Sequence, residues 1–177
     1  YLVEKDRTNL GQKDQHGRTP FLYSAHNRVE VIEYLLSVGE DIHQEDVTGH
    51  NILILASGYK VDANVLHFLI DCGLYLEKRN HYGDTALSYS VQHGNHKNFL
   101  ILVDKKADMK TVNNLGQTLI HTAVKANNML SLNFVLNKIP EEVHTVDLFN
   151  KTPIMYFKSV EALKVLIENR ASLKKSD

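Results

Sequence analysis

The chain repeats one phrase five times, and its middle copy is Asn80-His-Tyr-Gly83-Asp-Thr85-Ala86-Leu87. The other four copies begin at Asp14, Asp46, Asn113 and Asp147. Successive copies start 32, 34, 33 and 34 positions apart, and five occurrences at nearly constant spacing are hard to obtain by chance. A period of this length is typical of a repeat protein, in which each structural unit stacks on its neighbours.

A cluster of three apolar residues follows each phrase. Its members are spaced i, i+3 and i+4, which places them on one face of a helix. The five clusters are Ile32-Leu35-Leu36, Leu66-Leu69-Ile70, Phe99-Leu102-Val103, Leu132-Val135-Leu136 and Leu163-Leu166-Ile167. A turn follows the first two clusters at Gly39 and Gly73, because a helix end favours a left-handed residue and glycine adopts that conformation without a Cβ clash.

The phrase itself predicts a turn followed by a helix. Gly83 and its equivalents permit a turn conformation that a Cβ would strain, and Asn150 in the last copy is one of the few other residues tolerated there. A threonine two residues later, such as Thr85, is expected to cap the exposed N–H groups of the helix. Pro20 and Pro153 then fit the first helical turn.

This unit resembles the ankyrin repeat, whose signature is T-P-L-H-x-A within about 33 residues. The signature stands here as Thr19-Pro20-Phe21-Leu22-Tyr-Ser-Ala25 in the first copy and as Thr118-Leu119-Ile120-His121-Thr-Ala123 in the fourth. The resemblance covers essentially the whole chain and implies an all-α ankyrin-repeat solenoid, built from helix-turn-helix units with β-turn fingers. It also implies that His121 hydrogen-bonds backbone groups of a finger.

We therefore predict one continuous solenoid domain. Its repeats span residues 14–45, 46–79, 80–112, 113–146 and 147–177, and residues 1–13 form the end of a preceding repeat. Because the chain begins inside a repeat with Tyr1 and ends at Asp177, where another finger would start, we expect it to be a fragment of a longer protein.

Some residues depart from the repeat pattern. Lys106 and Arg170 stand where the helix-ending glycine is expected. If the left-handed turn persists, each is expected to lower the stability of the fold by about 1 kcal/mol. Pro140 cannot continue a helix, so the second helix of its repeat is expected to end by another route. The last unit is about three residues short between Phe157 and Val160, which predicts a truncated first helix.

Composition argues against several classes of partner. The chain has 20 Lys and Arg residues against 21 Asp and Glu residues, so it lacks the basic excess that nucleic acid or an anionic membrane favours. Its longest apolar runs, 52–56 and 99–103, have five residues, far fewer than the roughly 20 that a spanning helix needs. The single cysteine, Cys72, cannot close an intramolecular disulfide. We expect an intracellular, reducing location in the cytoplasm or nucleus.

We find no catalytic residues, metal site or cofactor motif in the sequence. Glycines occur singly, without a phosphate-binding or nucleophile-elbow motif. His93 and His96 have the spacing of metal ligands, but they fall in a loop and no third ligand is identifiable, so a solvated loop is predicted. Cys72 is expected to be a small, semi-buried residue at a helix C-terminus, where the helix dipole disfavours a thiolate.

The resemblance implies a protein-interaction scaffold, because ankyrin arrays characteristically bind proteins on the concave face of their fingers and first helices. The partner would be another protein or peptide, and the array would act as a monomer or as part of a larger chain. The alternative is a targeting or regulatory module of a multidomain enzyme whose catalytic domain lies outside this chain. A set of catalytic motifs beyond either end would favour the alternative.

The second, third and fifth positions of each phrase are predicted to form a solvated finger tip. The third position is apolar in three successive units, at Tyr82, Leu115 and Phe149. Stacked repeats would align these side chains as an exposed stripe, and such patches usually mark interfaces. The alternative is that fingers pack on each other and partly cover Leu115 and Phe149.

Other residues are predicted to surround this stripe. Its polar rim is expected to consist of Arg18, Arg79 and His81, in keeping with the interface preference for aromatic and arginine anchors. His16 and His50 are further finger-tip positions. The inward ends of the first helices are expected to add His26, Tyr59 and His93.

Overall fold

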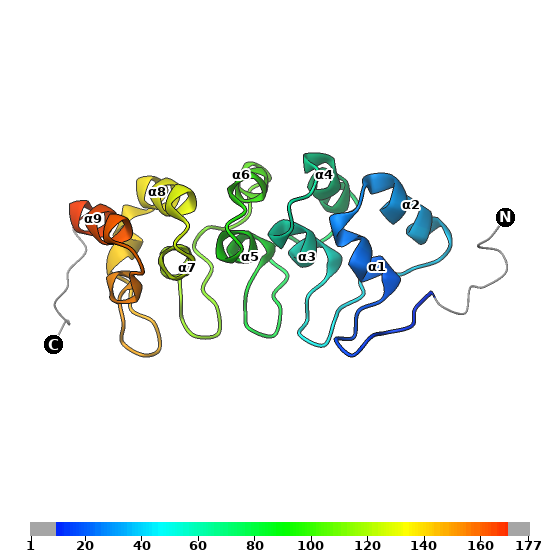
Figure 1. Ribbon diagram of the computed structural model, residues 1–177, viewed down its shortest axis with the longest axis horizontal. Helices are drawn as coiled ribbons and strands as arrows, with labels where there is room; N and C mark the ends of the chain where they lie inside the picture. Colours follow the sequence, from blue (N-terminus) through cyan, green and yellow to red (C-terminus); the bar gives the residue numbers. More distant parts are fainter. Residues whose placement is uncertain (1–9, 170–177) are drawn as a thin grey trace.

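A computed structural model describes residues 10–169, which form an elongated array of two helical layers (Figure 1). The first helix of each unit lies in one layer: α1 Pro20–Tyr23 with η2 Ser24–His26, α3 Ile52–Gly58, α5 Ala86–Gln92, α7 Leu119–Ala126 and η4 Pro153–Tyr156. The second helix lies in the other: α2 Val29–Ser37, α4 Ala63–Asp71, α6 His96–Asp104, α8 Met129–Lys138 and α9 Val160–Glu168. The fingers project beyond the layer of first helices.

The expected all-α solenoid is confirmed, and residues 10–169 contain no β-strand. The predicted helix-starting caps form in the first three units. The Thr19 and Asn51 side chains accept hydrogen bonds from the third helical N–H of α1 and α3, and Thr85 forms a reciprocal capping box with Ser88. Thr152 departs from this pattern, since its hydroxyl is buried and makes no hydrogen bond in the described part of the chain.

A continuous hydrophobic core runs along the array between the two layers. Phe21, Ile52, Leu87 and Ile120 contribute from the first helices, and all are at most 1% exposed. Leu102 contributes from α6 and is completely buried. The extensive contacts of each helix pair within residues 10–169 are with its neighbours along the chain, so the stability of the array is approximately a sum of neighbouring contacts.

Gly83 shows why the turn of the phrase favours glycine. Its φ angle is 80°, and a Cβ at this position would lie 2.6 Å from the backbone nitrogen of Asn114 in the next finger. Asn150 holds the equivalent position in the last unit with φ 56°, as expected. Glycine therefore serves both the turn and the close approach of adjacent fingers.

The predicted departures from the repeat pattern are also observed. Lys106 keeps the left-handed turn with φ 70°. The chain leaves α8 through a separate turn of 3₁₀ helix, η3 Pro140–His144, and η4 is a short 3₁₀ helix instead of a full α-helix. Arg170 lies outside the described residues, as do residues 1–9 of the segment assigned to a preceding repeat. None of the helices in residues 10–169 has both the length and the apolar character needed to span a bilayer.

Candidate functional site

Each finger is folded by the side chain of its first residue. The Asn80 Oδ1 atom accepts hydrogen bonds from the backbone N–H groups of Tyr82 and Asp84, both at 2.9 Å. Asp14, Asp46, Asn113 and Asp147 make the same pair of bonds in their own fingers. The Asp or Asn at this position therefore determines the conformation of every finger.

Adjacent fingers are joined by one backbone hydrogen bond each. The N–H of Asn114 donates to the carbonyl of Tyr82 at 2.9 Å, and the N–H of Leu148 donates to the carbonyl of Leu115 at 2.9 Å. Equivalent bonds run from Val47 to His16 and from His81 to Thr48. The fingers consequently form one continuous ladder along the array.

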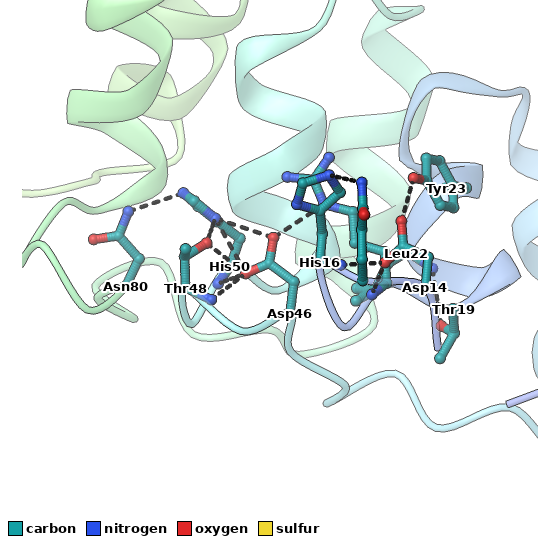
Figure 2. Close-up of polar contacts among 11 residues, drawn as sticks. Asp14, His16, Thr19, Leu22, Tyr23, Asp46, Thr48, His50 and Asn80 are labelled. Atoms are coloured by element: carbon teal, nitrogen blue, oxygen red, sulfur yellow. Dashed lines mark hydrogen bonds and ion pairs between the residues drawn. The ribbon is translucent and has the colours of Figure 1, made fainter. Parts of the chain in front are cut away.

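Side chains reinforce this ladder, because the fifth residue of a finger contacts the first residue of the next one. The Arg18 Nε donates to Asp46 at 3.0 Å, and the Gln117 amide donates to Asp147 at 3.2 Å. His50 Nε2 lies 3.0 Å from the Asn80 amide nitrogen, so His50 bridges Asp46 and Asn80 (Figure 2). In the remaining pair, the Asn113 side chain faces Asp84 closely enough to lower the pKa of its carboxyl group.

These contacts contradict the prediction that fifth positions are solvated in the second, third and fourth fingers, whereas Lys151 in the last finger is exposed. His50, Asp84 and Gln117 are only 6%, 8% and 4% exposed, because each is covered by the next finger. His50 is therefore a residue of the ladder and not of a solvated tip. The sequence held a signal for this pairing, since the pairs match a donor with an acceptor: Arg18 with Asp46, Asp84 with Asn113, and Gln117 with Asp147.

The ladder shifts the pKa values of its carboxyl groups in opposite directions. Burial alone would raise the pKa of Asp46, but hydrogen bonds from Thr48, from the His50 backbone and from Arg18 outweigh it and hold the pKa at about 2. Burial raises the pKa of Asp84, and the side chains of Asn113 and Ser88 do not fully offset that effect. The folded protein thus favours the charged form of Asp46 and disfavours the charged form of Asp84.

The third finger positions carry the predicted apolar stripe, which we define as Tyr82, Leu115 and Phe149. Their side chains are 58%, 42% and 59% exposed, so neighbouring fingers leave much of each surface open to solvent. The backbone of each residue takes part in the finger turn or the ladder, whereas burial of the side chain contributes little to the core. The stripe is a surface that the fold does not require.

A groove of about 910 Å³ lies between the fingers and the first helices. It brings together five of the predicted site residues: His50, His81, Tyr82, His93 and Leu115. The Tyr89 ring lines the same groove, with its centroid 4.9 Å from that of His50 and 4.2 Å from that of His93. Burial, followed by the influence of His50, lowers the pKa of His93 and favours its neutral form.

The remaining predicted residues lie outside this groove. Phe149 continues the stripe beyond it, and His16 is exposed on the first finger. Arg18 pairs with Asp46 in the ladder, whereas Arg79 stays exposed while donating to the carbonyl of Val112 at 2.7 Å.

His26 and Tyr59 do not reach the groove either. They form an edge-to-face ring pair with centroids 5.6 Å apart, and His26 lines a separate hollow between the first two units. The predicted set is therefore divided between two places on the array.

The sequence prediction missed several groove residues that come from helices and from the loop after η4. They are Gln92, Thr122, Lys125 and Lys158. Lys125 Nζ donates to the Gln117 side chain at 2.8 Å and lies 5.4 Å from the centre of the Tyr156 ring. Lys151 Nζ lies 5.3 Å from the same ring, so two ammonium groups share one aromatic side chain.

Two histidines outside the groove, His121 and His96, have structural partners. His121 Nδ1 accepts from the Thr118 backbone at 3.2 Å, and Nε2 lies 3.0 Å from the carbonyl of Lys151, which confirms its expected role toward finger backbone. His96 contacts Ser131 at 3.1 Å and stacks on Phe99, so it packs apart from His93. Residues 10–169 contain no group of three metal-ligating side chains.

Cys72 is exposed and not semi-buried, because α4 ends there and no neighbouring element covers the turn. Partial burial and then the nearby Asp71 and Glu33 carboxylates raise the pKa of its thiol. The thiolate is therefore disfavoured at this position, in the direction expected from the sequence, but the causes are desolvation and the neighbouring carboxylates.

Comparison with known proteins completes the assignment of the family. A model of three consecutive ankyrin repeats matches residues 38–113, and a single ankyrin repeat model matches residues 16–47. The chain belongs to the ankyrin repeat family. Ankyrin repeats generally mediate protein–protein interactions and are generally non-catalytic.

The relatives of this ankyrin array come from different organisms and carry different names. "Ankyrin repeat protein OPG189" of Monkeypox virus is 26% identical over 142 residues, which cover 78% of this chain and 24% of the viral protein. An "L-asparaginase" of Dirofilaria immitis is 24% identical over 93% of this chain and 28% of that protein. "Protein phosphatase 1 regulatory subunit 12A" of Rattus norvegicus is 31% identical over 66% of this chain and 12% of that protein. The chain thus spans about a quarter of the length of the first curated relatives it matches.

Proposed function

We propose that this ankyrin array binds another protein or peptide on the concave surface formed by its fingers and first helices. The observation that carries the proposal is the stripe of Tyr82, Leu115 and Phe149, which stays 42–59% exposed at equivalent positions of three successive units. Isolated exposed apolar residues are normal on a protein surface, but a row in register on successive repeats, which begins in a groove and continues beyond it, is a feature of interaction sites.

The rigidity of the fingers supports the same proposal. Asx-type hydrogen bonds fix each finger, and the ladder fixes each finger relative to the next, as the bond from Asn114 to Tyr82 illustrates. A partner that docks on such a platform does not have to order it first, so little binding free energy is lost to conformational entropy.

The test compares the 177-residue chain with a Tyr82→Ala/Phe149→Ala variant as immobilised bait in quantitative affinity capture. We expect proteins captured by the wild type to be depleted from the variant at least about tenfold, as for truncation of aromatic anchors. The matched control is Tyr75→Ala, which removes a tyrosine that is 70% exposed in the turn after α4 and away from the fingers. Tyr75→Ala should capture like the wild type.

Thermal unfolding separates binding from stability. Both exposed-site variants should unfold within a few degrees of the wild type, because surface substitutions usually change stability by about 0.5 kcal/mol or less. Equal capture by the wild type and the Tyr82→Ala/Phe149→Ala variant would overturn the proposed surface, as would loss of capture in Tyr75→Ala alone.

A second candidate function is a targeting or regulatory module within a larger enzyme. It is favoured by the relative named L-asparaginase, of which the matched segment makes up 28%. In both candidates the array binds a protein and does not carry out catalysis itself, and we propose an intracellular, reducing location because the exposed Cys72 is a free thiol. The full reading frame of the source gene decides between them, since a catalytic motif set flanking the array would establish the second candidate.

A further inference from the structure

The backbone of the finger ladder constrains what can bind to it. The tip N–H and C=O groups that point from one finger to the next are already paired, as between Asn114 and Tyr82 and between Leu148 and Leu115. A partner strand therefore cannot join this ladder at these groups by β-augmentation. Recognition along the stripe must come from side chains.

The spacing of the stripe matches one extended conformation. Neighbouring helices generally pack about 8–10 Å apart, and we expect a similar spacing along the stripe because its residues occupy the same position in successive units. A polyproline II helix has three residues per turn and a rise of about 3.1 Å per residue, so every third side chain lies on one face about 9 Å apart. A peptide in this conformation presents one side chain to each of Tyr82, Leu115 and Phe149.

The charge at one end of the groove indicates which charge the bound peptide carries. Lys125 and Lys158 line the groove, and Lys151 shares the Tyr156 ring with Lys125. Among the residues that the structure describes, none of these three lysines has a carboxylate within 4.0 Å.

The carboxylates of the fingers are largely buried, although Asp84 lines the same groove and its Coulombic interaction with Lys125 partly offsets that one charge. Asp147 accepts from Tyr156 at 2.6 Å and from Gln117 at 3.2 Å, and Asp84 is buried in the ladder. The accessible charge at this end of the concave surface is consequently positive.

We propose that the partner segment is an acidic peptide in the polyproline II conformation. Its apolar side chains, one at every third position, lie on the stripe, and its carboxylates lie toward Lys125, Lys151 and Lys158. This inference deepens the proposed function and rests on it, since it names the chemistry of the partner that the concave surface takes.

The test uses synthetic peptides as probes, with fluorescence anisotropy of the 177-residue chain at low salt. The first probe consists of four Glu-Pro-Leu triplets. The second replaces every Glu with Lys, and the third has the composition of the first but with its four leucines consecutive. We expect the first probe to bind at least about tenfold more tightly than either of the others, and to weaken as salt rises, because charge and spacing both contribute.

Charge variants localise the effect. Lys151→Gln/Lys158→Gln should weaken binding of the Glu-Pro-Leu probe about three- to tenfold at low salt, as expected for two solvent-exposed ion pairs. The matched control is Lys97→Gln/Lys164→Gln, which removes the same charge from exposed positions on the second helices α6 and α9 and should leave binding unchanged.

Several results would overturn this inference. They are equal binding of the three probes, equal loss in both lysine variants, or tighter binding of a 12-nucleotide single-stranded DNA than of the acidic probe. The proposed function is tested separately by the Tyr82→Ala/Phe149→Ala capture experiment. Stripe-dependent capture with no preference for the acidic probe would reject the peptide chemistry and retain protein binding on the concave surface.

Discussion

The pairing of Asp84 with Asn113 offers a sharp test of the side-chain ladder. Asn113 Oδ1 accepts from the backbone N–H groups of Leu115 and Gln117, both at 3.0 Å, and its side chain faces the buried Asp84 and lowers the pKa of that carboxyl group. The substitution Asn113→Asp preserves both acceptor bonds of the finger. It replaces only the donor with an oxygen, so two carboxylates then face each other.

The size of the effect follows from this geometry. Two unit charges about 4 Å apart repel by about 4 kcal/mol at an effective dielectric constant of about 20, and the lost amide contact adds about 1 kcal/mol. We expect Asn113→Asp to lower the free energy of unfolding at pH 7 by about 3–5 kcal/mol, because uptake of one proton by the pair relieves part of the repulsion. Adding Asp84→Gln recreates the Gln117–Asp147 pair, and it should restore stability to within about 1 kcal/mol of the wild type.

The assay is urea unfolding followed by far-UV circular dichroism at pH 7 and pH 5. The facing carboxylates raise the carboxyl pKa in the folded state, so the folded Asn113→Asp variant binds more protons than the unfolded chain. Its deficit relative to the wild type should therefore shrink as the pH falls. Asp84→Gln alone is the control and should be mild. A stable Asn113→Asp variant, or a double variant no better than Asn113→Asp, would refute the pairing.

Three further predictions concern the core, a strained turn and acid stability. Leu102→Ala should lower the urea unfolding free energy by about 2–5 kcal/mol, whereas Leu100→Ala, 39% exposed on the same helix, should cost less than about 1 kcal/mol. Lys106→Gly should raise the melting temperature by relieving a residue with φ 70°, a gain of about 0.5–1 kcal/mol, and a lower melting temperature would contradict this. Because the pKa of Asp46 is lowered to about 2, its stabilising effect is present above pH 4 and is lost as the pH falls toward 2. The advantage of the wild type over Asp46→Asn should thus shrink by about 1–2 kcal/mol between pH 5 and pH 2, and a constant difference would argue against this role of Asp46.

The sequence predicted the repeat architecture because its signals are local. These local signals are the threonine caps, the turn at Gly83, the stop at Pro140 and the helical spacing around Leu102, each of which depends on residues within one unit. The left-handed Lys106 could also be placed, since its register in the repeat is fixed by its neighbours.

The site was only partly predictable because its geometry depends on contacts between units. His50 is a polar residue that the repeat pattern places at a finger tip, yet the next finger covers it and Asn80 contacts its ring. Lys125 reaches the groove from a helix face whose direction follows from how α7 packs on its neighbours, which no single repeat specifies. Tyr59 is expected from the sequence to add to the binding surface, but its ring pairs with that of His26 away from the groove.

The most direct test of the central claim is to map a captured partner on the array by amide and methyl NMR. We expect the largest shift changes upon binding at Tyr82, Leu115 and Phe149 and at groove residues such as Lys125, with little change on the second helices. Changes concentrated on α2, α4, α6 and α8, with the fingers unaffected, would contradict it.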